Sequence, residues 1–514
     1  MRSRTSVPVV ARMAADRTGP RGWADPNYTM LGKRASGCRQ RPPAGLDDRR
    51  PARIDRPHGR VPHLRRYYHD DRQRRVVPWS RGLRAAASTS KGPAGDGRGL
   101  SLASLRDRVP CPAHPQRNEH MDQHDHRSLG NRLDLFHIQD DAPGMVFWHP
   151  RGYAVYRLLE DYIRGQLRRL GYAEVRTPQL LPRDLWERSG HWEKFRDAMF
   201  VVDAGDGRQM ALKPMSCPGH LQIFNRRRRS WRELPVRFCE FGACHRDEPS
   251  GSMHGLMRTR AFEQDDAHVF CREADVEAEV SRFVGLLRRV YAELGFADCA
   301  VALSTRPPLR AGSDADWDWA EAGLAEAARA NGLDFTIAAG QGAFYGPKLE
   351  FALRDRLGRS WQCGTVQLDR VLPGRLGTSY VAPDGSAVVP VMIHHAVFGS
   401  MGRFIAMLLE HHGGALPFWL APEQVAVAPI AREQAGYAAT VVDGFAAAGV
   451  RAVLSAGDDS LARRIVVAHD EQVPVMAIVG AREAAAGTVT LRERDGTQAV
   501  LRLEDAAAVL AARR

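Results

Sequence analysis

Three segments of this 514-residue chain concentrate side chains that could bind a metal ion or a phosphate group. They are residues 213–220, 244–268 and 394–404, and together they supply cysteine, histidine, arginine and acidic residues. Cysteine thiolate and imidazole are typical zinc ligands. Arginine keeps its charge and presents a planar fork that matches phosphate oxygens. The segments therefore indicate metal or nucleotide chemistry, provided that the fold brings them together.

Taken one at a time, these side chains have simpler explanations. Free cysteine is among the most buried residue types, so Cys217 is also consistent with a structural thiol in the core. His268 and His394 are consistent with ordinary core or surface histidines, and the arginines with a solvated face. The three candidate ligands also lie far apart in the sequence, unlike those of a compact zinc finger. Because neither a P-loop nor a GxGxxG motif is present, a nucleotide would be held in another way.

The elements that would position these segments have an α+β pattern. Apolar residues recur at three- and four-residue steps over 153–170, which predicts a helix that ends at Gly171. A short strand, 173–177, follows and stops before Pro178. Between 199 and 364 short strands alternate with turns, which favours an antiparallel sheet over a parallel βαβ array. Further helices are expected over 274–294, 317–330 and 401–410, and a buried strand over 388–393.

The pattern changes after a linker at 416–422. Strands and helices alternate over 424–429, 433–448, 451–454, 460–469 and 474–479, and a hairpin (488–492 and 498–501) and a last helix follow. This order predicts an independent α/β domain. We therefore expect two folded domains, one over 121–420 and a smaller one over 421–514.

The net charge of +13 comes entirely from the first quarter of the chain. Residues 1–120 hold 26 basic and 10 acidic residues, whereas residues 121–514 carry a net charge of −3. The first 120 residues contain 24 Arg, 13 Pro and no Phe, too little apolar material to offset the entropy of ordering a backbone. We expect a disordered Arg/Pro-rich extension. There are two alternatives. The segment is an RNA-binding tail, or it is upstream sequence that is not part of the functional protein.

The cysteine and hydropathy patterns restrict the compartment. The eight cysteines are scattered without a CxxC pair, which is typical of a reduced chain and not of a disulfide scaffold. No stretch is long and apolar enough for a transmembrane helix, and the N-terminus lacks the apolar region of a secretory signal. We expect a cytoplasmic protein without a membrane partner. An Arg-rich organelle-targeting segment stays open as an alternative.

In their order, the three segments resemble the signature motifs of class II aminoacyl-tRNA synthetases, and most specifically those of threonyl-tRNA synthetases. The resemblance extends from about Asp125 to the C-terminus. It is carried by blocks at 125–130 (Asp-His-Arg-Ser-Leu-Gly), 143–152, 189–192, 215–220 (Met-Ser-Cys-Pro-Gly-His), 245–251 (His-Arg-Asp-Glu-Pro-Ser-Gly), 264–268 (Gln-Asp-Asp-Ala-His), 342–348, 362–369 and 391–394. It implies a class II antiparallel-sheet catalytic core with a zinc site over 121–420 and a small α/β anticodon-binding domain over 421–514. The N-terminal and editing domains of typical bacterial members are not recognisable, so we expect a form without them.

The resemblance also implies roles for single residues. Cys217, His268 and His394 match the family's zinc ligands, and Mg²⁺ would accompany ATP. The implied ATP-binding residues are Arg246, Glu248, Arg258, Phe262, Gln362 and Arg403, and the implied threonine-binding residues are Met215, Gln264, Asp266 and Tyr345. The implied catalytic residues are Arg246, Arg403, Lys348 and His191, of which His191 matches a histidine that deprotonates the terminal ribose of tRNA.

Outside the catalytic core the match is looser. The resemblance puts Glu483 and Arg492 on strands that read the anticodon, while Val466 replaces a basic residue of a nearby helix. The strand near Pro178 resembles the motif that builds the dimer interface, so a homodimer is expected. Within the core, Gly402 replaces a glutamate before the motif 3 arginine.

The function that the resemblance implies is ligation of L-threonine to tRNA(Thr) with ATP, by a chain without its own editing domain. Two alternatives stay open. One is a paralogue that activates threonine or a related β-hydroxy amino acid for a non-tRNA acceptor. The other is a non-catalytic tRNA-binding regulator. A site built to bind a hydroxyl group discriminates against valine, which lacks the hydroxyl, by about 10⁴–10⁵-fold. It discriminates against serine, which lacks only a methyl group, by about 10–200-fold.

Overall fold

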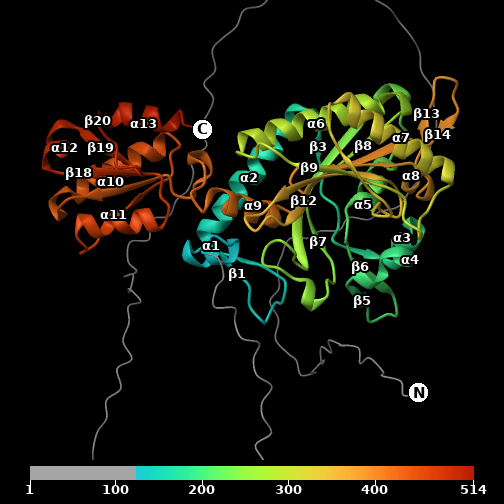
Figure 1. Ribbon diagram of the computed structural model, residues 1–514, viewed down its shortest axis with the longest axis horizontal. Helices are drawn as coiled ribbons and strands as arrows, with labels where there is room; N and C mark the ends of the chain where they lie inside the picture. The colour runs from blue at the N-terminus through green and yellow to red at the C-terminus, as the bar shows by residue number, and fades with distance from the viewer. Residues whose placement is uncertain (1–122, 514) are drawn as a thin grey trace, which may run out of the picture. The chain divides into compact units, whose positions relative to one another are not determined.

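A computed structural model describes residues 123–513, so the predicted extension over 1–120 lies outside the described residues. Two sheets organise the described part of the chain, an eight-stranded sheet and a five-stranded sheet (Figure 1). Helices accompany both sheets, and the predicted α+β class is confirmed. Among the described residues, no helix combines the length and the apolar character that a membrane crossing requires.

The eight-stranded sheet is antiparallel through its six central strands, as predicted. Its strand order is β10-β9-β11-β12-β15-β8-β7-β3. The strands are β3 (Ala173–Glu174), β7 (Val236–His245), β8 (Ala261–Cys271), β9 (Ala300–Ser304), β10 (Thr336–Ala338), β11 (Lys348–Arg354), β12 (Ser360–Asp369) and β15 (Val391–Ala396). Only the edge pairs, β10 with β9 and β3 with β7, are parallel.

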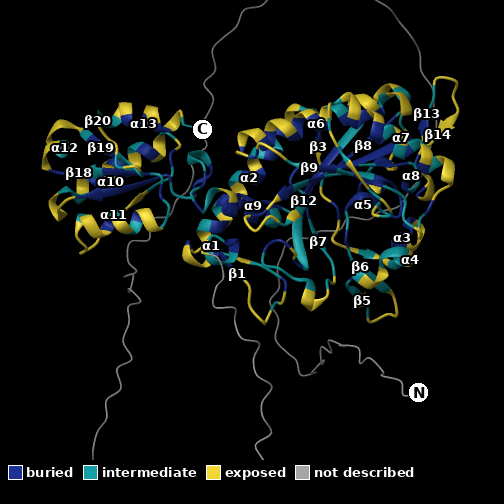
Figure 2. Cartoon of the chain, viewed as in Figure 1, coloured by how far each residue is buried: buried dark blue, intermediate teal, exposed yellow. Residues whose placement is uncertain are grey.

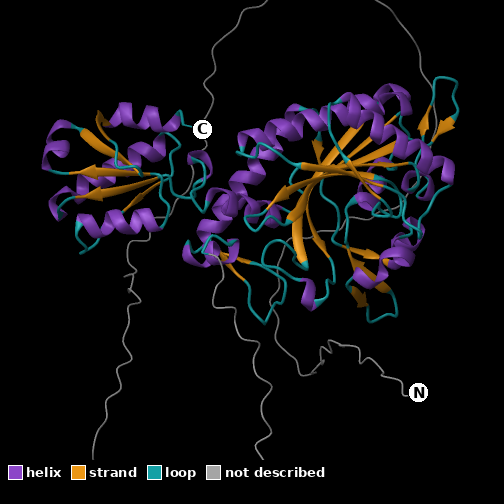
Figure 3. Ribbon diagram, in the orientation of Figure 1, coloured by secondary structure: helices purple, strands orange, loops and turns teal. Residues whose placement is uncertain are grey.

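Four long helices pack their apolar faces into the main hydrophobic core with this sheet (Figures 2 and 3). They are α2 (Pro150–Arg169), α6 (Val276–Glu293), α7 (Asp314–Ala330) and α9 (Met401–His412). The sequence predicts a helix at each of these four places. The α7 helix begins three residues earlier than predicted, because Ser313 and Asp316 form a capping box at its N-terminus.

Two predicted strands are shorter or shifted in the structure. The strand expected over 388–393 begins only at Val391, because Pro390 has no N–H group to donate to a ladder. Residues before Pro390 pair separately, as β14 (Ala387–Val388) with β13 (Tyr380–Val381). The strand expected over 173–177 is limited to β3, after which the chain contacts Glu240 through Thr177.

The remaining elements before the five-stranded sheet are shorter. They are α1 (His126–Arg132), α3 (Arg183–Ser189), α4 (His191–Phe195), α5 (Cys217–Phe224), α8 (Leu372–Arg375), β1 (Phe136–His137), β2 (Phe147–Trp148), β4 (Leu180–Pro182), β5 (Val201–Asp203) and β6 (Gln209–Leu212). Strands β4, β6 and β5 form an antiparallel sheet, and β1 pairs with β2. These elements carry several of the residues that the next subsection describes.

The five-stranded sheet has the order β17-β16-β18-β19-β20. Its strands are β16 (Val425–Pro429), β17 (Ala452–Leu454), β18 (Val475–Val479), β19 (Thr488–Glu493) and β20 (Gln498–Arg502), and its helices are α10 (Ala435–Ala447), α11 (Leu461–Asp470), α12 (Ala481–Ala486) and α13 (Leu503–Ala511). The first three strands are parallel, and β19 and β20 are antiparallel additions. The sheet has a hydrophobic core on each face, in agreement with the predicted α/β unit. One segment differs, because residues 481–486, which include part of a predicted recognition strand, form helix α12.

Candidate active site

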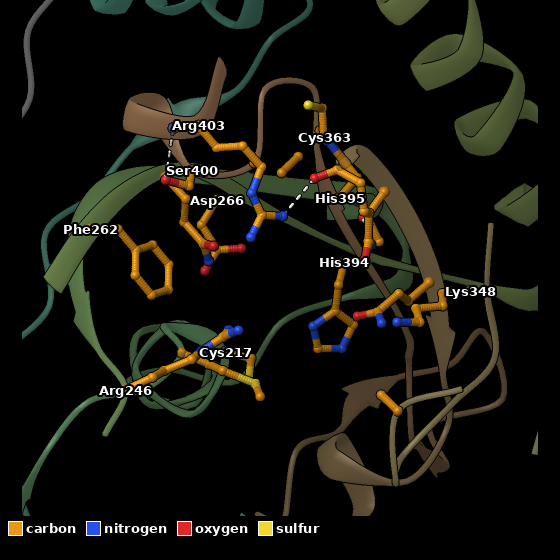
Figure 4. Close-up of a pocket in the computed structure, with 18 of the residues that line it drawn as sticks. Cys217, Arg246, Phe262, Asp266, Lys348, Cys363, His394, His395, Ser400 and Arg403 are labelled. Atoms are coloured by element: carbon orange, nitrogen blue, oxygen red, sulfur yellow. Dashed lines mark hydrogen bonds between the residues drawn. The ribbon is translucent and has the colours of Figure 1, made fainter. Parts of the chain in front are cut away.

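A cavity of about 350 Å³ is lined by residues of β8, β12 and β15, by Lys348 of β11, and by residues of neighbouring loops and helices. It collects residues from all three segments that the sequence singled out. The predicted ligands of metal, ATP and threonine on its wall are Met215, Cys217, Arg246, Glu248, Arg258, Phe262, Gln264, Asp266, His268, Tyr345, Gln362, His394 and Arg403, and Lys348 lies beside them. Figure 4 shows Arg246 and Arg403 on opposite sides of the cavity.

Strand register brings the three candidate metal ligands together. Successive side chains of a strand point to opposite faces, so Gln264, Asp266 and His268 of β8 share one face. His268 lies directly opposite His394 of β15. Cys217 is the first residue of α5. One ligand atom from each of the three candidates lies within 4.8 Å of the other two, and all three residues are buried.

The two histidines lie close enough to hold one cation between them. His268 Nε2 lies 3.0 Å from His394 Nδ1. The outer nitrogens of both rings have other partners: His394 Nε2 donates to Asp369 Oδ2 at 2.9 Å, and His268 Nδ1 lies 2.8 Å from His220 Nδ1. Two inner lone pairs at this separation repel each other unless a proton or a metal ion lies between them. One thiolate and two imidazoles suit zinc and leave a coordination position open.

The pKa values of these ligands follow from their burial. Burial raises the pKa of the Cys217 thiol well above its ordinary value and lowers the pKa of His268 well below its own. Burial therefore favours the neutral thiol of Cys217 and the neutral ring of His268. A divalent cation reverses this for the thiol, because a coordinating thiol is deprotonated. The residues present thus fit a zinc ion.

Two arginines are held at the cavity by backbone carbonyl groups. Arg403, in the first turn of α9, donates from Nε to the carbonyl of Met257 at 2.8 Å and from Nη1 to the carbonyl of Gln362 at 2.7 Å. Arg246 donates from Nε to the carbonyl of Pro214 at 3.3 Å. Burial lowers the pKa of Arg403. Among the described residues no carboxylate pairs with Arg246, Arg258 or Arg403 within 4.0 Å, so their charges are available to an anion.

An aromatic surface lies next to the arginines. The guanidinium carbon of Arg246 is 5.1 Å from the centre of the Phe262 ring and 5.7 Å from that of Phe195. Glu248 and Gln362 also line the cavity. The Gln362 amide donates to Thr365 Oγ1 at 2.5 Å. A flat ring with a carboxylate and an amide nearby is suited to binding a planar base.

Asp265, on the other face of β8, anchors the loop that leads into α9. Its carboxylate accepts from the N–H groups of Val397 (2.8 Å), Phe398 (3.0 Å) and Gly399 (2.9 Å). Burial raises the pKa of Asp265 to about 7, although these three N–H groups act in the opposite direction. The loop positions Ser400, whose Oγ accepts from the N–H of Arg403 at 3.4 Å. Asp265 therefore supports Arg403 without lining the cavity.

The cavity wall also carries a phenol, an amide and a carboxylate, those of Tyr345, Gln367 and Asp266. The Tyr345 hydroxyl donates to Gln367 Oε1 at 3.0 Å. Burial raises the pKa of Asp266, which faces the metal-ligand cluster from β8. Lys348 Nζ is paired with Glu350 Oε1 at 2.5 Å. Gln367 carries no role in the sequence-based prediction, although it lies in the block at 362–369.

Among the residues with a predicted role in catalysis or in binding metal, ATP or threonine, His191 alone does not line the cavity. Its side chain is fully buried behind Cys217, with Nε2 at 3.8 Å from Cys217 Sγ. The Ser189 hydroxyl donates to the carbonyl of Trp186, so its oxygen accepts from His191 Nδ1 at 2.9 Å. Burial lowers the pKa of His191 to about 3. In the structure this ring therefore contacts a candidate metal ligand and not the cavity surface.

A second group of ligand-type side chains, Asp125, His126 and Glu410, is also buried. Its polar atoms already have protein partners. His126 Nδ1 pairs with Glu410 Oε1 at 2.7 Å, and His126 Nε2 accepts from the N–H of Leu256 at 3.1 Å. Asp125 accepts from the backbone and side chain of Arg127. The group is a hydrogen-bonded junction between α1, α9 and the loop before β8.

In the C-terminal domain the two predicted anticodon-reading residues do not meet in one cavity. Arg492 lines a cavity of about 210 Å³, together with Val466 of α11. Glu483 lies in the first turn of α12, where it accepts from the N–H of Gly480 at 2.9 Å and from Thr490 Oγ1 at 3.0 Å. These bonds explain why residues 481–486 form a helix and not the strand expected at this position.

Several buried polar residues that support the site have no role in the sequence-based prediction. They are Glu240 and Asp265 on β7 and β8, Asp369 at the end of β12, and His220 on α5. A signal for one of them was present. Glu240 is an acidic residue between Cys239 and Phe241 in a largely apolar strand, and buried acidic groups require specific partners.

Comparison with known proteins agrees with this architecture. Residues 200–412 match the tRNA synthetase class II core domain (G, H, P, S and T), and residues 424–513 match the anticodon binding domain. Prolyl-tRNA synthetase from Giardia lamblia shares the fold, with a TM-score of 0.59 at 18% identity, over 74% of this chain and 73% of its own. The chain thus has the core and the anticodon-binding domain of a class II aminoacyl-tRNA synthetase.

Two more similar proteins define the family within this class. The RNA binding domain of threonyl-tRNA synthetase from Cryptosporidium parvum has a TM-score of 0.73 and 38% identity, over 76% of this chain and 98% of its own. Threonine–tRNA ligase from Caulobacter vibrioides is 55% identical over 413 residues, which are 80% of this chain and 63% of the relative. The chain belongs to the threonyl-tRNA synthetase family, which confirms the resemblance seen in the sequence. It spans about 63% of the length of the Caulobacter relative.

Proposed function

We propose that the protein is a threonine–tRNA ligase, which activates L-threonine with ATP and transfers it to the 3′ end of tRNA(Thr). One observation carries the proposal. A single cavity joins arginines that have no carboxylate partner in the described part of the chain to a buried Cys–His–His cluster. The arginines suit a polyphosphate, and the cluster suits a metal that recognises a hydroxyl-bearing amino acid. The names of the similar ligases support the same substrate.

In the activation step, the carboxylate of threonine attacks the α-phosphate of ATP and pyrophosphate leaves. Arg246 and Arg403 would bind the α-phosphate from two sides and stabilise the charge that develops there. Arg258 would hold the γ-phosphate, and Mg²⁺ would accompany the nucleotide. This assignment is supported by the carbonyl contacts that hold the Arg403 fork in a fixed orientation. Preorganised charges of this kind need no reorganisation when the transition state forms.

The adenine base would stack on Phe262. Glu248 would accept a hydrogen bond from the exocyclic amino group, and Gln362 would contact the nucleotide from β12. The support for this placement is the aromatic surface beside Arg246, which leaves the base adjacent to the phosphate-binding arginines.

The amino acid would bind at the other end of the cavity. A zinc ion held by Cys217, His268 and His394 would supply a Lewis-acidic position for the amino group and the β-hydroxyl group of threonine. Asp266 would accept the hydroxyl proton in a hydrogen bond. The remaining contacts that we assign to threonine come from Met215, Gln264 and Tyr345, with Lys348 close to the reacting carboxylate.

For the transfer step, we assign His191 as the base for the terminal ribose of tRNA. Since its Nε2 faces Cys217 Sγ in the structure, this role requires the ring to turn toward the cavity when tRNA binds. Arg492 and Glu483 are the proposed anticodon contacts in a domain over 421–514, separate from a catalytic domain over 121–420. The motif 1 resemblance around Pro178 supports a homodimer.

Two assays test the proposal. Threonine-dependent exchange of pyrophosphate into ATP measures activation, and charging of tRNA(Thr) measures transfer. We expect both activities, and removal of zinc with a chelator is expected to abolish the exchange. Exchange without charging would instead favour the paralogue with another acceptor. Absence of both activities in a folded, zinc-loaded protein would favour a non-catalytic tRNA-binding role.

A further inference from the structure

A row of buried polar side chains leads from the metal-ligand cluster into the protein core. It runs from His268 to His220, Glu240 and Lys213. His268 Nδ1 lies 2.8 Å from His220 Nδ1, His220 Nε2 lies 3.2 Å from Glu240 Oε2, and Lys213 Nζ lies 2.8 Å from Glu240 Oε1. Each of these four residues is at most 1% exposed. Only His268 lines the cavity, so the other three have no direct contact with a substrate there.

The carboxylate of Glu240 acts only as an acceptor in this row. Its Oε1 accepts from Lys213 Nζ and from the N–H of Thr177 at 2.9 Å. Its Oε2 accepts from the Thr177 hydroxyl at 2.8 Å. Since the Thr177 oxygen itself accepts from Lys213 Nζ at 2.9 Å, its hydrogen is free to point at Glu240. The nitrogen of His220 that approaches Oε2 must therefore be the donor, which puts a hydrogen on Nε2.

This hydrogen fixes the direction of the remaining bonds. A neutral His220 with hydrogen on Nε2 has a lone pair on Nδ1, which accepts from His268 Nδ1–H. The Nε2 lone pair of His268 is then left facing His394 and Cys217. A doubly protonated His220 would add a buried positive charge without a partner, because Lys213 already balances Glu240.

We propose that Glu240 and His220 are positioning residues that keep the hydrogen of His268 on Nδ1 and so leave its Nε2 available to the metal. The inference rests on the zinc site in the proposed function. Metal-binding histidines usually donate their outer N–H directly to a carboxylate or carbonyl group, and losing such a partner costs about 10–100-fold in metal affinity. His394 follows the direct form through Asp369, whereas His268 reaches its carboxylate through a second imidazole.

Glu240→Gln tests the direction of the row with little change in volume. If the new amide group faces His220, it donates to Nε2 and moves the hydrogen of His220 to Nδ1. The Nδ1–H groups of His220 and His268 would then point at each other. This repulsion would be removed if the hydrogen of His268 moved to Nε2, the nitrogen that binds the metal. If the amide group faces the other way, it opposes Lys213 Nζ and the Thr177 N–H. We expect the zinc dissociation constant to rise about 10–100-fold.

A matched pair at His220 tests the same point without changing the buried Lys213–Glu240 ion pair. Asn and Leu have nearly the same shape. The amide oxygen of His220→Asn can replace Nδ1 as the acceptor for His268 Nδ1–H, whereas His220→Leu offers no acceptor. We expect His220→Asn to keep the zinc dissociation constant close to that of the wild type, and His220→Leu to raise it about 10–100-fold. This pair decides the question if Glu240→Gln does not fold.

The measurement is zinc affinity by competition with a chromophoric chelator, on the full chain without substrates, with circular dichroism as the check of folding. Glu410→Gln is the matched control, since Glu410 is also buried and pairs with a histidine, His126, that is not part of the metal cluster. We expect this control to bind zinc as the wild type does. Folded Glu240→Gln and His220→Leu proteins with wild-type zinc affinity would overturn the proposed relay and leave the zinc site standing. A wild-type protein that binds no zinc would overturn the zinc site itself.

Discussion

Arg403→Ala gives the sharpest test of the proposed chemistry. In the structure the Arg403 guanidinium is fixed by the carbonyl groups of Met257 and Gln362 and has no carboxylate partner within the described residues. Its charge is therefore directed at the cavity and is not neutralised by the protein. Removing one preorganised donor from a developing negative charge typically costs about 10²–10³ in kcat, which corresponds to about 2.7–4 kcal/mol. We expect a loss of this size in threonine-dependent pyrophosphate exchange.

The cost to stability is expected to be smaller. Truncation leaves two carbonyl groups without their donor, and an unpaired buried acceptor costs about 1–3 kcal/mol. Because both carbonyl groups lie beside the cavity, water can replace the missing donor and bring the loss toward the lower end of that range. The Arg403→Lys variant keeps the positive charge, but a lysine side chain has no planar fork that donates to both carbonyl groups. The kcat of this variant should therefore fall between those of Arg403→Ala and the wild type.

Pyrophosphate exchange at saturating ATP and threonine measures the effect on kcat, and a thermal melt measures stability on the same samples. Arg306→Ala is the control, because Arg306 forms ion pairs with Glu321 and Asp318 outside the cavity, and exposed pairs contribute about 0–1 kcal/mol. It should leave kcat unchanged. A folded Arg403→Ala protein with near wild-type kcat, or one that changes only the KM for ATP, would refute the assignment of Arg403 to the transition state.

Three further predictions concern selectivity, acid stability and the loop before α9. Serine should support exchange with a kcat/KM about 10–200-fold below threonine, and valine about 10⁴–10⁵-fold below, so equal rejection of both would contradict the metal-based pocket. Burial acts to raise the pKa of Glu240, but its bonds to His220, Lys213 and Thr177 lower it from 4.5 to about 2. The resulting stability is present above pH 4.5 and lost as the pH falls toward 2. It amounts to about 3 kcal/mol and should be absent in Glu240→Gln when denaturant unfolding is measured from pH 2 to 5. Gly399 has φ +68°, and a Cβ there would lie 2.6 Å from the carbonyl oxygen of Cys363, so Gly399→Ala should lower the thermal midpoint. Gly165→Ala in α2, where an added Cβ meets nothing within 4 Å, should raise the midpoint, because it increases the free energy of unfolding by about 0.5–1 kcal/mol.

The elements of both domains could be predicted because their signals are local. Apolar periodicity indicates α2, α6 and α9, and turn residues and prolines separate the strands. The boundaries that differ have local causes that periodicity does not register. Pro390 delays β15, and the capping box at Ser313 extends α7. At 481–486 the side-chain bonds of Glu483 favour a helix where a strand was expected.

The assembly of the cavity could be predicted only in part. Residue types and motif order indicated which side chains belong together, but the pairing that brings His268 opposite His394 joins strands far apart in the chain. Strand pairing over such separations depends on the whole fold and has no signature at either residue. For the same reason the sequence did not show that His191 packs behind Cys217, at a depth where it does not line the cavity.

The charge balance around the metal-ligand cluster is a property that only the folded arrangement reveals. Glu240 is matched by Lys213, so this pair carries no net charge. Asp369 is fully buried, accepts from the N–H groups of Val371 and Leu372 and from His394, and has no Lys or Arg partner within 4.0 Å in the described part of the chain. Its carboxylate is therefore a buried negative charge without a protein counterion, and a bound metal ion would add a second one by deprotonating the Cys217 thiol. Buried charges are stable only when they are paired or bind a metal. A divalent cation held by Cys217, His268 and His394 would balance both charges, and this electrostatic argument for a metal at the proposed site does not use the motif resemblance.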